Sequence, residues 1–340
     1  MFLSTCYPPP TNPKTPNQTR KNVALNTPRQ LKNNDKSWTQ CFISSHINDQ
    51  GLSSGGNGAG VNYPLYQFNN PNYTENFTPE FRDFIDKHYN HSFEPLEILG
   101  YIYALLYSPN YRKRYESFLK IDYPKILFTE NKDLFRALSL LGIELIGLHV
   151  LNQESLNYKK LKDSTIGESG YSPSNESTEA HERNPIIKKP SHNESEQRLY
   201  INHSAYFSGV SQEIYDYRIG GYCVLDKYLK SHKNEDCDFD HVTCIIEVIA
   251  RTIEIQKTLG LLTSDLPHLK GNDRKALMQE ILQNPPPPPP FNTNIALILS
   301  RQAKAIGDLD FDAAFISKEA SDLNISSGGG GTAFPLFCLA

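Results

Sequence analysis

The sequence lacks the long apolar run that a membrane-spanning helix requires. No window of its 340 residues approaches the roughly 18 consecutive apolar side chains that such a helix needs. The first ten residues, MFLSTCYPPP, do not place a basic segment before an apolar one, so they do not resemble a secretory signal. We therefore expect a cytoplasmic protein that makes no membrane contact.

The sequence also lacks a basic excess and paired cysteines. Its 34 Lys and Arg residues against 38 Asp and Glu residues give a formal net charge of -4, so any contact with nucleic acid must come from a local patch. The six cysteines are scattered without a CxxC pair, which in an intracellular chain is typical of free thiols. A hydrophobic content of 38% over this length predicts about two domains with a real core.

A self-contained catalytic constellation is missing as well. The chain has no Gly-x-Ser-x-Gly, His-Glu-x-x-His or Walker-type motif. Asn284 and Phe291 differ from the Asn-Pro-Pro-aromatic loop of amino-methyltransferases, because a hexaproline run separates them. Cys237, His241 and Cys244 share one helical face, but their spacing is not a usual zinc pattern and the acidic residues around them favour simple capping. We predict no catalytic residues, no metal site and no cofactor.

Composition changes predict a first half of strands followed by helices. Residues 1–21 are rich in Pro, Thr, Asn and Lys without apolar periodicity, so we expect a flexible arm. Short apolar runs alternate with turn-forming residues over 22–66 and predict short strands. Thr78 then precedes a proline at the first position of a helix. Further helix starts are predicted at Ser92, Ser108 and Thr129, so that 22–151 forms a β region plus a helical core.

The second half begins with a polar, Ser-rich insertion at 152–184. Segments 185–189 and 198–201 flank a polar turn and are predicted to pair as a hairpin. Helices are expected from Ser211, from about Gly221 and over 239–259, with Gly260 as the last helix's stop. The remaining expected segments are a hairpin and helical half at 185–260, a linker at 261–290 that contains the hexaproline run, and a tail at 291–340.

The tail repeats part of the β region. NVAL at 22–25, followed by Arg29-Gln30, recurs as NIAL at 294–297, followed by Arg301-Gln302. FIS and SSGG within 42–56 recur within 315–329, and YPLY at 63–66 returns as FPLF at 334–337. Ordered matches at a nearly constant offset indicate a duplicated segment. The predicted fold is α+β, with a small N-terminal β region packed on a mainly helical core and a duplicated β-rich tail.

The second copy stops where helices should begin. An isolated sheet of two or three short strands is marginal in water, so the tail must be poorly ordered, displace the first copy or dock on another molecule. A short connection joins the first copy to the helices, whereas the second copy follows a stiff proline spacer. Closure entropy therefore favours the first copy on the core.

Residues 107–125 form the one local basic feature, with five basic and two acidic side chains. On a helix, Arg112, Lys113 and Arg114 would fan over a wide arc, while Tyr111, Tyr115, Phe118 and Leu119 would fill the other side. Two interpretations stay open from the residues alone: a solvated amphipathic face, or a face that contacts phosphates.

Several ordered segments of the chain form a distinctive series. They are YIYALLYS at 101–108, YRKRY at 111–115, FLKIDYPK at 118–125, YIN at 200–202, YFSGV at 206–210, YDYRIGGY at 215–222 and LDKYLK at 225–230. These segments resemble the C-terminal specificity region of type ISP restriction-modification enzymes. The resemblance covers about residues 20–258.

In that family one polypeptide carries a nuclease, a helicase-like ATPase, an adenine-N6 methyltransferase and, last, the target recognition domain. The resemblance implies that this chain is the last part alone, a sequence-specific recognition module for double-stranded DNA that lacks the catalytic domains. A separate methyltransferase or nuclease subunit would then supply the chemistry. The alternative is a truncated remnant that acts at most in protein contacts, which the acidic net charge favours.

The resemblance also directs attention to particular side chains. Reading DNA needs basic groups on phosphates and a few polar side chains at base edges. The predicted phosphate contacts are Arg112, Lys113, Arg114 and Lys120, and the predicted base contacts are Arg29, Gln30, Ser53 and Ser54. Arg218 is either a further basic contact or a buried arginine paired with Asp216.

Overall fold

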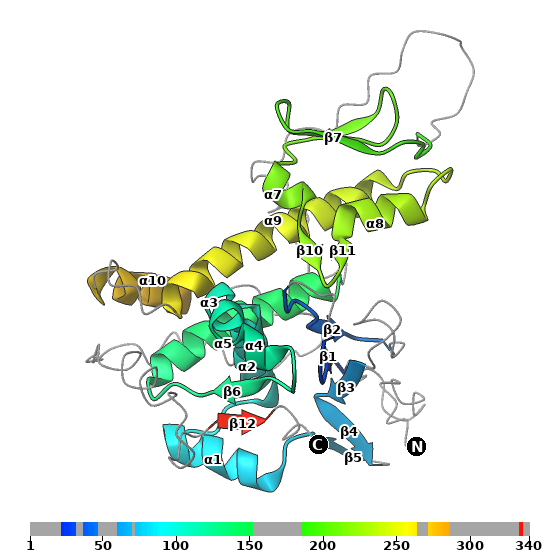
Figure 1. Cartoon of the computed structure of the whole chain (residues 1–340). Helices are drawn as coiled ribbons and strands as arrows, with labels where there is room; N and C mark the ends of the chain where they lie inside the picture. Colours follow the sequence, from blue (N-terminus) through cyan, green and yellow to red (C-terminus); the bar gives the residue numbers. More distant parts are fainter. Residues whose placement is uncertain are drawn as a thin grey trace, which may run out of the picture. The chain divides into compact units, whose positions relative to one another are not determined.

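The computed structural model describes residues 22–31, 37–46, 60–69, 72–151, 185–263, 271–285 and 333–335 (Figure 1). The chain divides into two compact units, each described separately below. Unit 1 comprises Met1–Ser155 and Ile255–Ala340, and unit 2 comprises Leu156–Glu254. The expected arm at 1–21, the insertion at 152–184 and most of the tail lie outside the described residues.

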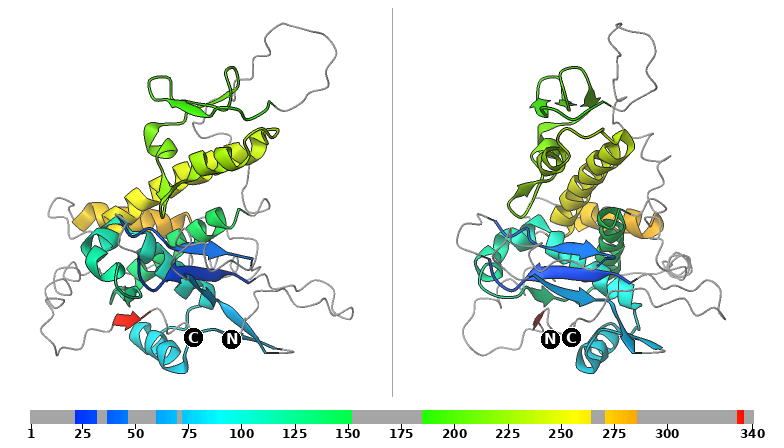
Figure 2. Two further views of the ribbon diagram at one scale, coloured as in Figure 1. Left: turned by 45° about the vertical axis from the view of Figure 1, so that its right-hand side comes forward. Right: turned by 90° about the vertical axis from the view of Figure 1, so that its right-hand side faces the viewer.

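Unit 1 begins with an antiparallel sheet in the order β2-β1-β3, formed by β1 (Ala24–Pro28), β2 (Phe42–Ser44) and β3 (Gly60–Pro64). All five residues of β1 are buried, as expected for a central strand that is covered on both faces. Figure 2 shows the three strands side by side, and β2 contacts the long helix α5. We call these three strands the β layer. They confirm the predicted N-terminal β region.

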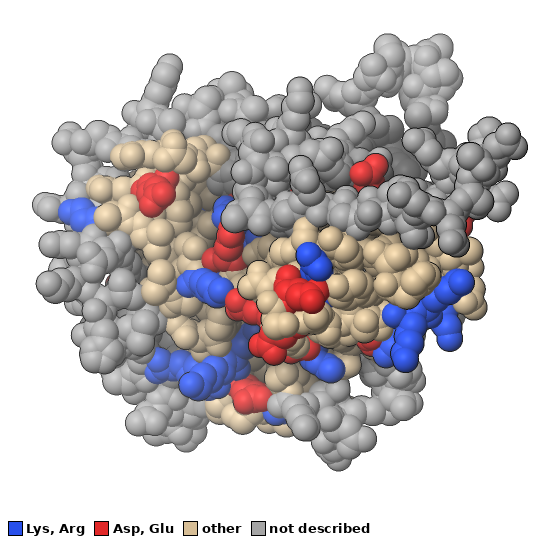
Figure 3. All heavy atoms as spheres, turned by 90° about the horizontal axis from the view of Figure 1, so that it is seen from above, with Lys and Arg blue, Asp and Glu red and all other residues tan. Residues whose placement is uncertain are grey.

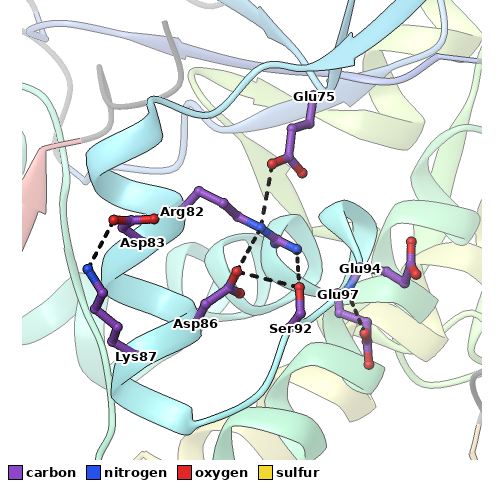
Figure 4. Close-up of polar contacts among 8 residues, drawn as sticks. All are labelled: Glu75, Arg82, Asp83, Asp86, Lys87, Ser92, Glu94 and Glu97. Carbon is purple, nitrogen blue, oxygen red and sulfur yellow. Dashed lines mark hydrogen bonds and ion pairs between the residues drawn. The ribbon is translucent and has the colours of Figure 1, made fainter.

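A hairpin links the β layer to the first helix. It consists of β4 (Tyr66–Asn69) and β5 (Asn72–Glu75). Glu75, at the end of β5, lies 3.5 Å from Arg82 Nε of helix α1 (Pro79–Tyr89). The same guanidinium lies 3.5 Å from Asp86 and donates to Ser92 Oγ at 2.8 Å, so one arginine ties the hairpin, α1 and the following turn together (Figure 4).

Local capping explains where the helices begin. The side chains of Thr78 and Ser108 accept the predicted N-cap hydrogen bonds, from Phe81 N and Tyr111 N, and confirm two of the expected starts. The other two starts fall two residues later than predicted. Ser92 bonds Arg82 instead of capping, so helix α2 (Pro95–Tyr107) begins with a capping box at Glu94. Asn131, which donates its N–H to Thr129, caps α5 (Lys132–His149).

Helices α2 and α5 make the most extensive contact between described elements. They cross where Gly100 meets Gly142, and a Cβ at position 142 would overlap the backbone carbonyl of Gly100. A Cβ at position 100 would stand 2.6 Å from the carbonyl oxygen of Ser139. Ser139 in turn donates its hydroxyl to the carbonyl of Glu97 at 2.7 Å. Two small residues therefore allow the two backbones to touch, and the apolar side chains around them form the core of unit 1.

Tyrosine hydroxyls hold the strand β6 (Lys125–Leu127) against the helices. Tyr111 donates to the carbonyl of Lys125 and Tyr101 to that of Leu127, both at 2.6 Å. Tyr89 donates to the carbonyl of Thr129 at 2.5 Å. Alternate carbonyls of an extended segment point to the same side, so the three tyrosine hydroxyls supply hydrogen-bond donors to the carbonyls along one edge of this segment. The strand pairs antiparallel with β12 (Ala333–Pro335), which belongs to the duplicated tail.

The end of helix α9 (Phe239–Leu262) differs from the prediction that Gly260 would stop it. The helix continues through Gly260 because Leu259 and Leu262 are both fully buried in its last turn. Asn110 donates its side-chain amide to the carbonyl of Gly260 at 2.7 Å. The expected linker at 261–290 also contains a helix, α10 (Gly271–Gln283), which contacts α5.

Unit 2 has its own hydrophobic core. A three-stranded sheet in the order β7-β8-β9 is made of Ser191–Asn193, Arg198–Tyr200 and Tyr206–Ser208. Its other elements are α7 (Gln212–Tyr215), the hairpin of β10 (Arg218–Ile219) and β11 (Tyr222–Cys223), α8 (Val224–Ser231) and the first part of α9. Leu199, Phe207, Leu225 and Ile246 are among the buried side chains that these elements share.

The predicted pairing of 185–189 with 198–201 is confirmed at one backbone hydrogen bond, from Lys188 N–H to the carbonyl of Ile201 at 3.0 Å. The strand that pairs with β8 along its length is 191–193, and Ile187 donates its N–H to the carbonyl of Glu235. Ser211 caps α7 as predicted, through a hydrogen bond from Ile214 N. Small antiparallel sheets with a predominance of helix confirm the α+β class. None of the helices in the described ranges is both long and apolar enough to cross a bilayer.

The close crossing of α2 and α5 gives a first testable prediction. Gly142→Ala should destabilise the chain by about 3 kcal/mol or more, because one of the two backbones has to move. Gly260→Ala is the matched control. It also lies inside a helix, but a Cβ there meets nothing within 4 Å, so it should be neutral or stabilising by up to about 1 kcal/mol. Urea unfolding of both variants measures the difference, and equal effects would contradict the crossing.

Candidate nucleic-acid interface

The predicted basic helix is two short helices. Helix α3 (Pro109–Arg114) ends at Tyr115, and α4 (Glu116–Leu119) follows at once. The break changes which side chains face the core. Tyr111 and Leu119 are buried as expected, but Phe118 is 53% exposed, contrary to its predicted place on the packed side. Lys113 and Arg114 are exposed at the end of α3.

The fold brings the end of β1 against the end of α4. Leu31 donates its N–H to the carbonyl of Lys120 at 2.9 Å. Two residues earlier, Arg29 Nε lies 3.1 Å from Asp122 Oδ1, and both side chains are exposed. Two predicted base contacts, Arg29 and Gln30, therefore lie near Lys120, a predicted phosphate contact about 90 residues away in sequence. We use the name basic surface for these three residues together with Lys113 and Arg114, which are exposed on the adjoining helix α3.

Acidic side chains accompany the basic surface. Lys120 lies 2.8 Å from Glu116, one turn earlier. A backbone hydrogen bond from Tyr123 and then the Arg29 guanidinium lower the pKa of Asp122. Figure 3 shows basic groups next to acidic groups at several places on the face it presents. Exposed ion pairs of this kind contribute little, so phosphates can compete for the cations at small cost.

Arg112 is placed differently from its two neighbours. Its Nε donates to the carbonyl of Leu106 at 2.6 Å, and its guanidinium carbon lies 4.4 Å from the centroid of the Tyr107 ring. The same carbon lies 5.7 Å from the ring of Trp38, which precedes β2. Its Nη2 is buried and has no hydrogen-bond partner among the described residues. These contacts give the half-buried Arg112 a packing role between the segment before β2 and the helices, and its predicted phosphate contact stays a prediction.

Two titratable groups lie near Arg112, the half-buried His149 and the buried Cys41. Burial, and then the charge of Arg112, lower the pKa of His149 to about 3. The Nδ1 atom of that neutral ring lies 2.8 Å from the Tyr103 hydroxyl. Burial raises the pKa of the Cys41 thiol to about 12, although Arg112 opposes the shift. The guanidinium is therefore the charged group of an otherwise neutral cluster.

Ser53 and Ser54 lie outside the described residues, so their predicted base contacts stay predictions. Arg218 lies on the hairpin β10-β11 of unit 2. It is exposed and donates to the carbonyl of Gly221 at 3.1 Å, so the interpretation as a buried arginine paired with Asp216 is wrong. Asp216 accepts instead from the side-chain amide of Gln212. The sequence does not predict the contact of Arg29 with Asp122, because the two residues are far apart in the chain and no local pattern connects them.

Cys237 and Cys244 are buried in unit 2, and the ring of His241 lies 5.2 Å from that of Tyr228. Burial, followed by the charge of Asp238, raises the pKa of the Cys237 thiol to about 11. Within the described ranges, His, Cys, Asp and Glu do not form a group of three that could hold a metal ion.

Comparison with known families gives one match, over residues 5–257, to the type ISP C-terminal specificity domain. This range includes β1 to β11, the basic surface and most of α9. The chain belongs to the type ISP C-terminal specificity domain family. A search of curated proteins found no match.

Three solved structures are similar to this chain at low sequence identity, and one of them, with a TM-score of 0.50, supports a shared fold. Similar chains are the DrdV–DNA complex (17% identity, TM-score 0.50), the type ISP restriction-modification enzyme LlaBIII bound to DNA (18%, 0.49) and a nuclease-deletion mutant of the type ISP enzyme LlaGI with a DNA substrate mimic (21%, 0.46). The matches cover 74%, 72% and 75% of this chain but 25%, 16% and 22% of those chains. This chain therefore spans a quarter or less of the length of these proteins.

The different placements of Arg112 and Lys113 can be tested directly. Arg112→Ala should lower the free energy of unfolding by about 1–3 kcal/mol, because it removes a hydrogen bond and a guanidinium packed on Tyr107. Lys113→Ala, its exposed neighbour, should change that free energy by less than about 0.5 kcal/mol. Urea unfolding of the two variants measures this, and equal losses would contradict the buried role.

His149 predicts a pH dependence of stability. The pKa of His149 is about 3 in the folded chain and about 6.5 in the unfolded chain. Between about pH 3 and pH 6.5, therefore, only the unfolded chain binds a proton at this residue. Stability should fall by up to about 1.4 kcal/mol per pH unit from this group as pH drops below about 6.5. Thermal unfolding at pH 7 and pH 4.5 should show a smaller loss in His149→Gln than in the parent. The exposed His203→Gln serves as the control and should retain the full loss.

Proposed function

We propose that the chain is a sequence-specific DNA recognition module of a restriction-modification system of the adenine-N6 methyltransferase and endonuclease type. The observation that carries this proposal is the specificity-domain match over 5–257, a range that contains the five residues of the basic surface. The similar solved chains are complexes with DNA, and we extend that partner, double-stranded DNA, to this chain.

Within this proposal the side chains divide by role. Lys113, Arg114 and Lys120 neutralise phosphates and fix the position of the module on the duplex. Arg29 and Gln30 reach base edges, where a guanidinium selects guanine and an amide selects adenine. Before DNA binds, the ion pair with Asp122 holds the Arg29 guanidinium in position. On binding, the guanidinium leaves Asp122 and contacts the base edge instead.

Catalysis is assigned to modules outside residues 1–340. The sequence contains no methyltransferase, ATPase or nuclease motif, and the similar solved chains are at least four times longer than the part matched here. A methyltransferase or nuclease, in the cytoplasm with its DNA, would take its target from this module. The chain itself then needs no cofactor.

A second candidate function, a protein-interaction module, is favoured by one specific observation. Phe118 and Ile121 are 53% and 66% exposed beside the basic surface. Large apolar side chains at neighbouring exposed positions are common where another protein binds. A partner subunit could use this apolar pair while DNA uses the basic side chains.

The DNA proposal predicts a distinct result for each class of contact. Lys113→Ala combined with Arg114→Ala should weaken binding to all duplexes about equally and reduce the slope of log K against log salt by roughly 0.9 per lost contact. Gln30→Ala should instead change the sequences selected from a random duplex pool, at nearly constant salt slope. Fluorescence anisotropy over a salt series, together with the pool selection, measures both effects.

The matched control is Lys87→Ala combined with Lys188→Ala, which removes the same charge at exposed positions outside the basic surface. Its slope should remain that of the parent. If both double variants reduce the slope equally, the basic surface has no special role. If none of the variants binds differently and Phe118→Ser abolishes partner binding, the protein-interaction function is the correct one.

A further inference from the structure

We propose that residues 294–337, the second copy, can replace the β layer on the helical core of the same chain. The structure has the first copy in this position, with its strands in the order β2-β1-β3. From the second copy it describes only β12, which pairs with β6. In the exchanged arrangement β12 leaves β6 and takes the place of β3.

The first argument is that the second copy preserves the side chains that fill the core. Leu25 is fully buried at the centre of β1, and Leu297 corresponds to it. Ile43 and Leu65 are also buried, and Ile316 and Leu336 correspond to them. The other conserved pairs are Val23 with Ile295, Ala24 with Ala296 and Tyr63 with Phe334. The apolar surface that the helices require is thus present twice.

The second argument concerns buried polar atoms of the first copy. Asn26 Oδ1, Thr27 Oγ1 and Trp38 Nε1 are buried and have no hydrogen-bond partner among the residues that the structure describes. The second copy has Ile298, Leu299 and Phe311 at the corresponding positions. All three unpartnered polar atoms are therefore absent from it. A buried donor or acceptor without a partner is unfavourable, so the three apolar replacements favour burial of the second copy at the position that the first copy now occupies.

The third argument is a paired change across two strands. Asn26 stands opposite Asn62 in the register of β1 with β3, and its amide donates to the Asn62 side chain at 2.7 Å. The second copy replaces both members at once, with Ile298 and Ala333. Changing both partners of a buried hydrogen bond to apolar groups is close to neutral, whereas changing one is not. The coordinated change is expected if Ile298 and Ala333 are to face each other as Asn26 and Asn62 do.

The connection to the second copy is comparable in length with helix α5. Residues 285–293 join α10 to the second copy, and nine residues of proline-rich chain can span about 28 Å at ~3.1 Å per residue. Helix α5 has 18 residues and is about 27 Å long. Both α10 and β2 contact α5, so the linker is about as long as the helix that these two elements share.

The exchange would change the DNA-facing side chains. Arg301-Gln302 would stand where Arg29-Gln30 stand now, but the following loop would be AKAIGDLDFDAA instead of LKNNDKSWTQC. This consequence rests on the proposed function, whereas the exchange itself does not. If it holds, one helical core presents either of two recognition surfaces.

The full-length chain provides an internal reporter, because Trp38 is its one tryptophan and lies in the first copy. Leu25→Asp places a charge at a fully buried position and should release the first copy. We expect tryptophan emission to shift to that of an exposed side chain, while cooperative thermal unfolding is retained. Leu297→Asp alone should alter neither, and Leu25→Asp combined with Leu297→Asp should lower the unfolding temperature by roughly 10 °C or more below that of Leu25→Asp.

Equal unfolding temperatures of Leu25→Asp and the double variant would overturn the proposal, because the second copy would then not substitute. Unshifted tryptophan emission in the double variant would also count against it. A further variant does not depend on releasing the first copy. Asn26→Ile, Thr27→Leu and Asn62→Ala together transplant the residues of the second copy, and they should raise the unfolding temperature. A lower temperature would show that these residues do not fit the position.

Discussion

The structure of unit 1 depends on the contact between Gly100 of α2 and Gly142 of α5. A side chain at either position would separate the helices, and the apolar side chains along both would lose contact together. The strand β2 contacts α5, and so does α10 on the carboxyl side of α9. Both copies of the duplicated segment are thus connected to the same helix, one through β2 and the other through the linker after α10. The position of α5 therefore determines where a β layer can lie.

The β layer is attached to this helix pair by a mixture of apolar and polar contacts. Leu25 and Ile43 fill the core, while the Tyr107 hydroxyl donates to the carbonyl of Cys41 at 3.1 Å. Arg112 packs on Tyr107 and near Trp38, so a residue from the most basic segment of the chain serves the interior. Its neighbours Lys113 and Arg114 remain at the surface. One short helix therefore joins the core to the proposed DNA contacts.

The parts of the fold that depend on neighbouring residues could be predicted from the sequence, and the parts that depend on distant partners could not. Thr78 and Ser108 cap helices as predicted, because a cap involves only the next three residues. The sequence predicts a cap at Ser92, but this side chain accepts a hydrogen bond from Arg82 of α1, a residue outside the segment that a capping pattern covers. The sequence could not distinguish the packed Arg112 from the exposed Lys113 and Arg114, because the three basic residues are consecutive. No change in composition marks the end of α3 at Tyr115. The meeting of Arg29 with Asp122 depends on the whole fold.

The three tyrosine hydroxyls on β6 also determine its register. Carbonyls of residues 125, 127 and 129 meet donors from α3, α2 and α1, so a shift of one residue would turn every acceptor away from its donor. Register is usually imposed by a neighbouring strand, but here three helices impose it. The loop between Lys120 and Lys125 carries Asp122, and it cannot change length without moving one of its fixed ends. Variation of the proposed recognition surface is thereby restricted to side-chain identity in this loop, and changes in loop length have to occur elsewhere in the chain.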